Sequence, residues 1–266
     1  MDIPHVSIND HKIDIPDDDT IELDRENYQN LEITKLKSYN NPDPSNETVG
    51  RAYLYFYEKF EPRSHLLDSA FNYLQQLPPD SVEQEWVHYY YLQEDWNRLI
   101  QFVNNQGITE FREAMPNYRI GQAFDNIGRA QKAITFYQKA IAQKPYNLNF
   151  HKKLGNLYLK QKALNNAEKE FKFLLKENPK TPMVHNNLGL IYLNKNQLAK
   201  ARKHIQQAIN LKPDYGAAAL NMAKVLYATK GQQAAINKLK KIIQKYPDQR
   251  PQARQLLQMF QSESNI

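Results

Sequence analysis

Apolar residues in the C-terminal half of the chain follow a helical spacing that recurs every 34 residues. In each period a bulky apolar residue precedes a small one, and an aromatic or apolar residue follows three positions after the small residue. Side chains at these distances lie on one side of a helix, so each period is predicted to begin with a helix that buries one face. The positions are occupied by Ile120, Gly121 and Phe124, by Leu154, Gly155 and Tyr158, by Leu188, Gly189 and Tyr192, and by Met222, Ala223 and Leu226.

A second helix is predicted in each period from an alanine and a bulky residue four positions further on. The small residue of the first helix and this alanine allow two antiparallel helices to approach closely. A proline then ends the second helix, because it lacks the amide hydrogen and disfavours helical geometry in the residue before it. One period is therefore a helical hairpin. The alanines are Ala133, Ala167, Ala201 and Ala235, the bulky residues are Tyr137, Phe171, Ile205 and Leu239, and the prolines are Pro145, Pro179, Pro213 and Pro247.

This order of residues resembles the tetratricopeptide repeat. The resemblance covers residues 114–249 as four repeats, 114–147, 148–181, 182–215 and 216–249, and the last departs from it with Ala223 in place of glycine and Leu226 in place of the aromatic residue. A single hairpin cannot bury its apolar face alone, so the repeats must stack. The resemblance implies an all-α fold, a right-handed α-solenoid of antiparallel hairpins that binds proteins or peptides.

The regions on either side of these repeats give weaker patterns. Residues 46–113 are predicted to add two degenerate hairpins, the second with a shortened turn, and residues 250–266 a capping helix and tail. Residues 1–45 are expected to form an extended or irregular acidic extension, because proline, aspartate and asparagine are frequent there. The apolar residues behind the hairpin predictions are Leu54, Leu67, Phe71 and Leu74, then Trp86, Val87, Tyr90, Trp96, Leu99 and Val103, and those of the cap are Ala253, Leu256, Leu257 and Phe260.

Charge is distributed unevenly along the chain. Residues 1–113 contain 22 acidic and 9 basic side chains, whereas residues 114–249 contain 6 acidic and 24 basic ones. This asymmetry is expected to draw acidic partners toward the C-terminal repeats. The alternative is a solvated lysine-rich surface, because lysines such as Lys139, Lys172, Lys203 and Lys241 fall on the second helices, which form the outer side of such a solenoid.

The sequence carries no pattern typical of an enzyme. It has no cysteine, and neither the metalloprotease, phosphate-binding, nucleophile-elbow nor dinucleotide motif is present. His151 and His185 recur one period apart at a position that usually packs in the core, so no metal site is predicted. With no apolar stretch long enough for a membrane and no signal peptide, the chain is expected to be cytoplasmic or a fragment of a longer exported protein.

Nucleic acid is a disfavoured partner, although the repeats are basic and rich in tyrosine. Tyr137, Tyr158 and Tyr192 occupy predicted core positions, where they cannot stack on bases. The helical repeat that reads RNA base by base also has a different pattern. A protein or peptide is therefore the predicted partner.

The inner, concave face of the first helices is the predicted peptide-binding surface. Tetratricopeptide domains that hold a C-terminal carboxylate do so with lysine, asparagine, asparagine, lysine and arginine over three repeats. Lys152, Asn156 and Asn187 match the first three of these residues, whereas Ala217 and Asn221 replace the last two, so the resemblance implies half of the clamp. Asparagine amides can still bind the backbone of an extended peptide. The predicted lining residues are Lys152, Asn156, Asn186, Asn187, Asn221 and Lys224.

A second resemblance concerns the segment Ile3 to Ile13. It resembles the stretch after the last haem-attachment motif in exported multihaem c-type cytochromes with a tetratricopeptide C-terminal half. This implies His5 or His11 as a distal haem ligand in a longer protein. The chain itself lacks the haem-attachment motif, so no cofactor is predicted in it. Two functions follow: a non-catalytic protein- or peptide-binding scaffold, or a docking module of such a cytochrome.

Overall fold

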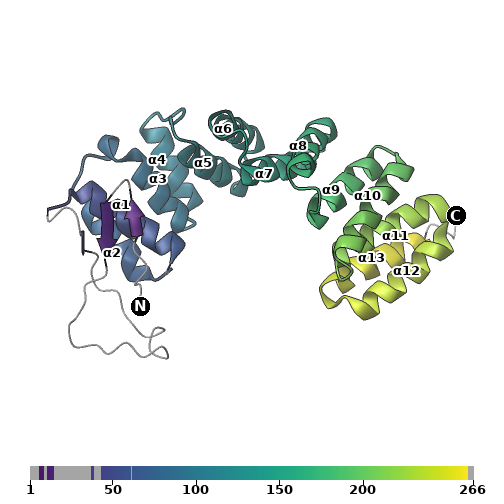
Figure 1. Cartoon of the computed structure of the whole chain (residues 1–266). Coiled ribbons are helices and arrows are strands. Elements are labelled where there is room, and N and C mark those ends of the chain that lie inside the picture. Colours follow the sequence, from purple (N-terminus) through teal and green to yellow (C-terminus); the bar gives the residue numbers. More distant parts are fainter. Residues whose placement is uncertain (1–5, 9–10, 15–36, 39–42, 61, 263–266) are drawn as a thin grey trace, which may run out of the picture. The chain divides into compact units, whose positions relative to one another are not determined.

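The computed structural model describes residues 6–8, 11–14, 37–38, 43–60 and 62–262. It consists of two compact units, Met1–Gln143 and Lys144–Ile266, called the first and second unit below. Both units are built from antiparallel helical hairpins (Figure 1). The helical-repeat fold predicted from the sequence is confirmed. None of the helices in the described ranges is both long and apolar enough to cross a membrane.

The first unit begins with three short strands, β1 (Val6–Ile8), β2 (His11–Asp14) and β3 (Lys37–Ser38). They form an antiparallel sheet in the order β1-β2-β3. Val6 lies opposite Ile13, and Ile13 lies opposite Ser38. Regular structure is thus present in a segment for which the sequence predicts extended or irregular chain.

Three hairpins follow in the first unit. Within each hairpin and between successive hairpins the helices pack against one another. The bounds are α1 (Asn46–Lys59) with α2 (Ser64–Leu74), α3 (Glu83–Leu92) with α4 (Trp96–Asn105), and α5 (Ala114–Asn126) with α6 (Ala130–Gln143); a short 3-10 helix, η2 (Pro79–Ser81), precedes α3.

Four hairpin turns, two in each unit, share one backbone conformation. Glu94, Gly128, Lys162 and Asn196 stand 34 residues apart and have φ between 54° and 77°, the left-handed region. The period therefore reaches back into the hairpin of α3 and α4. The predicted shortening of that turn is wrong: α3 and α4 are only 10 residues each, against 13 for α7, while the turn between them has the usual length.

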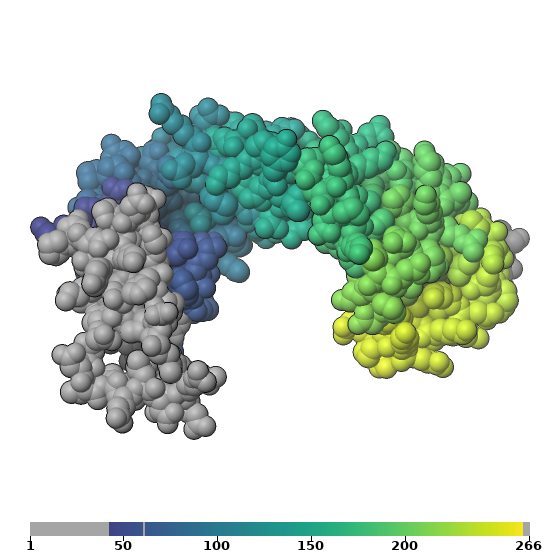
Figure 2. All heavy atoms as spheres, viewed as in Figure 1, coloured from purple at the N-terminus to yellow at the C-terminus, as the bar shows by residue number. Residues whose placement is uncertain are grey.

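Three further hairpins and a final helix make up the second unit. In Figure 2 the residues of α12 and α13 form its yellow surface. Helix α13 packs on α12, and the Phe260 ring stacks on Tyr227 with 3.9 Å between centroids, which covers the last hairpin. The bounds are α7 (Leu148–Lys160) with α8 (Leu164–Glu177), α9 (Pro182–Asn194) with α10 (Leu198–Leu211), α11 (Gly216–Lys230) with α12 (Gln232–Lys245), then the 3-10 helix η3 (Pro247–Gln249) and α13 (Arg250–Ser262).

The core positions of the repeats are buried as the pattern predicts. The four alanines of the second helices are each 0% exposed. Tyr137, Tyr158 and Tyr192 are also buried, so the prediction that they are core residues is confirmed. At the small position of the first helix the helices are in close contact, because a Cβ added to Gly189 would lie 2.3 Å from Ile205 Cγ1.

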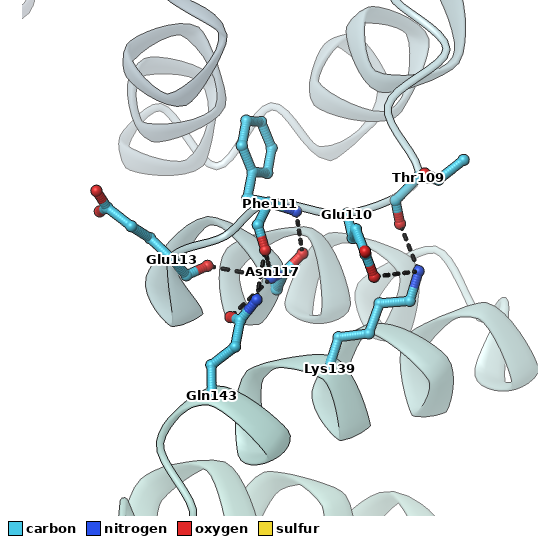
Figure 3. A network of polar contacts seen from close by, with 7 residues as sticks. All are labelled: Thr109, Glu110, Phe111, Glu113, Asn117, Lys139 and Gln143. Atoms are coloured by element: carbon cyan, nitrogen blue, oxygen red, sulfur yellow. Dashed lines mark hydrogen bonds and ion pairs between the residues drawn. The ribbon is translucent and has the colours of Figure 1, made fainter.

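A buried amide closes the loop that leads into α5. Asn117 Nδ2 donates to the Phe111 carbonyl (2.8 Å) and the Glu113 carbonyl (3.1 Å), and its Oδ1 accepts from the Phe111 amide (3.0 Å) (Figure 3). Gln143, at the end of α6, also donates to the Phe111 carbonyl. Asn117 is 0% exposed, so a buried side chain holds the backbone of this loop in place by hydrogen bonds.

The same kind of bond recurs in the next two repeats. His151 Nε2 lies 2.8 Å from the Pro145 carbonyl oxygen, and His185 Nε2 lies 3.0 Å from that of Pro179. In each case the acceptor is six residues upstream of the side chain, as it is for Asn117. The fourth repeat has Ala219 at this position, and the Pro213 carbonyl instead accepts from the Tyr246 hydroxyl at 3.1 Å. The helix-ending prolines thus also provide carbonyl acceptors that fix the entry of the following helix.

Candidate peptide-binding face

All six residues predicted to line a peptide site belong to the second unit, on the first helices of its three hairpins. We call the surface formed by α7, α9 and α11 the first-helix face. Hydrogen bonds between side chains join these helices in succession, and they divide the six residues into two groups. Lys152 and Asn156 lie on α7, Asn186 and Asn187 on α9, and Asn221 and Lys224 on α11.

The first amide pair joins α7 to α9 and remains partly accessible. Asn187 Nδ2 donates to Asn156 Oδ1 at 3.1 Å. Both residues are half-buried. The bond uses one donor of Asn187 and one acceptor of Asn156, so the Asn156 amino group and the Asn187 carbonyl oxygen remain for a ligand. A donor and an acceptor therefore stand side by side on this face.

The second amide pair joins α9 to α11 and is buried. Asn221 Nδ2 donates to Asn186 Oδ1 at 2.9 Å, and the residues are 7% and 5% exposed. The Asn186 side chain also hydrogen bonds the Tyr215 hydroxyl. This pair holds two helices together and offers little surface to a ligand. The sequence prediction missed the pairing, although a signal existed, since residues 186 and 221 are one period plus one residue apart.

Two lysines lie on the same face as the amides. Lys152 and Lys224 are both half-buried, and among the described residues neither has a carboxylate within ion-pair distance. Burial lowers the pKa of the Lys224 ammonium, because removing a charge from water disfavours the charged form. A ligand carboxylate or carbonyl oxygen at Lys224 would relieve this cost.

The residues at the positions that hold a C-terminal carboxylate in other tetratricopeptide domains are only partly suited to binding one here. Ala217 is half-buried and has no polar side chain, and Asn221 is occupied by its bond to Asn186. The cations that would hold a terminal carboxylate at these two positions are therefore replaced. The amides and lysines of this face fit the backbone of an internal segment better than a free C-terminus.

The two recurring histidines, His151 and His185, hydrogen bond to other residues of the second unit. His151 is buried, with Nδ1 2.6 Å from Glu170 Oε2 and its ring stacked on Phe173. His185 Nδ1 lies 3.1 Å from His204 Nδ1. No group of three or more metal-ligating side chains occurs in the described ranges. Of the histidines in the N-terminal segment, His5 lies outside the described residues, and for His11 only the backbone, in β2, is described.

A polar pocket of about 410 Å³ lies in the first unit, lined by side chains of α1, α3 and α5. Glu58 Oε2 is 3.1 Å from Arg119 Nη2 and 3.2 Å from His88 Nε2. The bond from His88, together with Arg119, lowers the pKa of Glu58 to about 2, and burial lowers the pKa of His88 to about 4. Near neutral pH His88 is therefore uncharged, and the charges of Glu58 and Arg119 neutralise each other. The sequence prediction missed this cluster, which combines residues far apart in the chain and at unrelated repeat positions.

Three family models match the repeats. Models described as "Tetratricopeptide repeat" match residues 128–191, 182–215 and 217–248. No curated protein sequence matches the chain significantly.

Several solved structures share the fold at low sequence identity. "MamA 41-end from Desulfovibrio magneticus RS-1" is 19% identical with a TM-score of 0.56, covering 64% of this chain and 96% of that one. The structure titled "Functional Characterization of Pseudomonas Aeruginosa pilF" is 14% identical with a TM-score of 0.60, covering 82% and 99%. "YrrB: a TPR protein with an unusual peptide-binding site" is 15% identical with a TM-score of 0.54, covering 75% and 94%. At these identities the likeness concerns the fold.

Proposed function

We propose that this tetratricopeptide-repeat protein is a non-catalytic scaffold that binds an extended segment of another protein on the first-helix face of α7, α9 and α11. The observation that carries the proposal is the half-buried amide pair of Asn156 and Asn187, which lies on the same face as two lysines without carboxylate partners. The matching repeats over residues 128–248 support it at the level of the family.

The chemistry of the amide pair fits a peptide backbone. An extended peptide presents alternating carbonyl and amide groups, and side-chain amides can bind both kinds. The Asn156 amino group would donate to a peptide carbonyl, and the Asn187 carbonyl oxygen would accept from a peptide amide. Because the two side chains already bond each other, their orientation is fixed before a ligand arrives, which lowers the entropy lost on binding.

The lysines add selectivity for the ligand's side chains. Lys152 on α7 and Lys224 on α11 belong to the two outer helices of the face. A carboxylate on the ligand would bring Lys224 a partner that the described residues do not supply. We therefore expect bound segments to contain at least one acidic side chain.

A relative with the same fold gives the proposal a precedent. The printed title of the YrrB structure assigns a peptide-binding site to that protein. Its fold matches this chain with a TM-score of 0.54. The first-helix face is where we place the corresponding activity in this chain.

The test is a peptide selection followed by affinity measurement. Peptides would be selected from a random displayed library on the immobilised full chain, labelled, and measured by fluorescence anisotropy. The variant Asn156→Ala/Asn187→Ala should weaken binding about thirtyfold, since two hydrogen bonds worth about 1 kcal/mol each are lost. The variant spares Asn221, whose loss would remove the donor bound to the buried Asn186 Oδ1. The matched control is Asn210→Ala/Asn237→Ala, two exposed asparagines on second helices.

Salt and helicity complete the design. The loss of affinity caused by the Asn156→Ala/Asn187→Ala change should be similar at low and high salt, because salt screens the lysine contacts of all three proteins alike. Circular dichroism should give the same helicity for all three proteins. Equal affinity of the wild-type chain and the Asn156→Ala/Asn187→Ala variant for selected peptides would remove the first-helix face as the binding surface.

A further inference from the structure

The last five α-helices that the structure describes, α9 to α13, contain no acidic residue. Within residues 182–262 the carboxylate side chains are those of Asp214 and Asp248, and neither lies in an α-helix. The same residues include 13 lysines and arginines. In this part of the structure no basic side chain of α10, α12 or α13 forms an ion pair. Among the described residues, the positive charges of α10, α12 and α13 are therefore not paired with carboxylates.

Helix α12 concentrates this charge in a row. Lys238, Lys241 and Lys245 follow each other at spacings of three and four residues, which places them on one side of the helix. We call them the α12 lysine row. Lys241 and Lys245 are exposed and Lys238 is half-buried. Burial and the two neighbouring ammonium groups lower the pKa of Lys238. Like charges at this spacing repel each other in the free protein.

Lys238 also occupies a repeat position whose side chain, in other repeats, contacts a residue of the first helix. In the two preceding repeats this position holds Glu170 and His204, and each contacts a histidine of the first helix. The equivalent first-helix residue in the last repeat is Ala219, whose methyl group cannot accept a hydrogen bond. The half-buried ammonium group of Lys238 thus lacks the first-helix partner that its equivalents have. The distances between ring nitrogen and partner atom are 2.6 Å for His151 with Glu170 and 3.1 Å for His185 with His204.

We propose that the α12 lysine row binds an acidic segment of a partner protein, with one carboxylate of that segment on Lys238. The row spans about 10 Å along the helix, since seven residues rise 1.5 Å each. An extended chain covers that distance in about three residues. The segment would therefore carry two or three carboxylates within about four or five residues.

The composition of the surface favours an acidic polypeptide over nucleic acid. Helix α12 has four lysines and no arginine, and arginine is the side chain that recognises phosphate in a bidentate manner. Among the described residues the large apolar side chains classed as exposed are Phe60, Phe71, Tyr146 and Met259, so none of α10, α11 or α12 presents an exposed aromatic ring. Binding of single strands usually depends on such rings.

This surface is distinct from the first-helix face. The row lies on a second helix, whereas the proposed peptide site lies on α7, α9 and α11. One partner segment can therefore be bound on each, and the two proposals can fail independently.

The experiment uses the full chain and a fluorescein-labelled peptide of alternating glutamate and serine. The test variant replaces the α12 lysine row by glutamine. The control makes the same change in α8, which has three lysines at the same spacing but also Glu168, Glu170 and Glu177, and where Lys172 is already paired with Glu168 at 2.6 Å. Net charge changes equally in both. The test variant is Lys238→Gln/Lys241→Gln/Lys245→Gln, and the control is Lys169→Gln/Lys172→Gln/Lys176→Gln.

We expect the α12 variant to weaken peptide binding at least tenfold and the α8 variant less than twofold, by fluorescence anisotropy at moderate salt. Should the triple variant lose helicity, Lys241→Gln/Lys245→Gln changes only exposed residues and should still weaken binding severalfold. Selected peptides whose binding is weakened by Asn156→Ala/Asn187→Ala should bind the α12 variant as they bind the wild-type chain.

Three results would overturn the proposal. One is the absence of binding to the wild-type chain. Another is equal weakening in the α12 and α8 variants, which would mean diffuse charge attraction. The third is a labelled oligonucleotide that binds more tightly than the peptide and is lost in the α12 variant, which would assign the row to nucleic acid.

Discussion

Substituting alanine for Gly189 should destabilise the second unit, whereas the same change at Gly155 should not. The two glycines occupy the same repeat position. A Cβ on Gly189 would lie 2.3 Å from Ile205 Cγ1 and 3.3 Å from the Ala201 carbonyl oxygen. On Gly155 the nearest atoms, in Glu170 and Phe171, are 3.2 Å away. The first contact requires a side chain or helix to move, and the second requires an adjustment of a few tenths of an ångström.

The magnitudes follow from two opposing terms. Alanine inside a helix is more favourable than glycine by about 0.5–1 kcal/mol. Overpacking of a filled core costs about 1–3 kcal/mol. Gly189→Ala should therefore lose about 1–2 kcal/mol of unfolding free energy, and Gly155→Ala should be neutral or slightly stabilising. A difference of this size corresponds to about 2–8 °C in thermal midpoint for a chain of this length.

The last repeat supplies a compensating change. There Ala223 stands at the glycine position and Leu239 at the Ile205 position, and both are 0% exposed. Leucine has a single γ carbon that can turn to another rotamer, whereas the branched isoleucine is restricted at χ1. The double variant Gly189→Ala/Ile205→Leu should therefore recover part of the loss.

The assay is urea unfolding of the full chain, followed by circular dichroism at the helical band, for the wild type, both single variants and the double variant. If Gly189→Ala proved as stable as Gly155→Ala, the close approach of α9 and α10 would not limit packing at this position. A double variant less stable than Gly189→Ala alone would contradict the role assigned to Ile205.

Three more predictions address packing and pH. Tyr137→Phe should stabilise the first unit by about 1 kcal/mol, because the buried hydroxyl has no hydrogen-bond partner among the described residues; a lower midpoint in urea would contradict this. The pKa of His88 is lowered from 6.5 to about 4 in the folded state, so its contribution to stability is complete above pH 6.5 and is lost as the pH falls toward 4. His88→Gln should flatten the fall in urea midpoint between pH 7 and pH 4.5, a range above most of the titration of Glu58. Ala167→Leu and Ala201→Leu should each cost about 1–3 kcal/mol, and unchanged thermal midpoints would mean that these alanines do not lie at close helix crossings.

The fold could be predicted from the sequence because the repeat constrains every level of structure in the same way. Small residues, aromatic residues and prolines at fixed positions set helix faces, helix contacts and helix ends together. Lys172 and Lys203, predicted on the outer side, are exposed as expected. Among the helical hairpins, that of α3 and α4 departs in detail, because short helices change the spacing of apolar residues without changing the turn.

The pairing of polar side chains could not be predicted from the same pattern. Asn187 and Asn221 occupy equivalent positions one period apart, yet Asn187 bonds to a half-buried partner and Asn221 to a buried one. The partner is the residue of the preceding first helix that carries a side-chain amide, which is Asn156 on α7 in one case and Asn186 on α9 in the other. In the first unit, Glu58 and Arg119 are 61 residues apart and stand at unrelated repeat positions. Such contacts depend on side-chain reach across stacked helices, which periodicity does not encode.

The hydrogen bond from a first helix to the carbonyl six residues upstream defines where the array can be cut and rejoined. A segment that starts at the proline, such as residues 145–178 or 179–212, contains both the acceptor and the histidine that binds it. Duplication or exchange of such segments would carry the entry geometry of the helix along intact. The last repeat breaks this rule, because the Pro213 carbonyl is bound by Tyr246, 33 residues later. That repeat can end an array. A copy of it inserted without Tyr246 would lose the hydrogen bond to the Pro213 carbonyl at the start of its first helix.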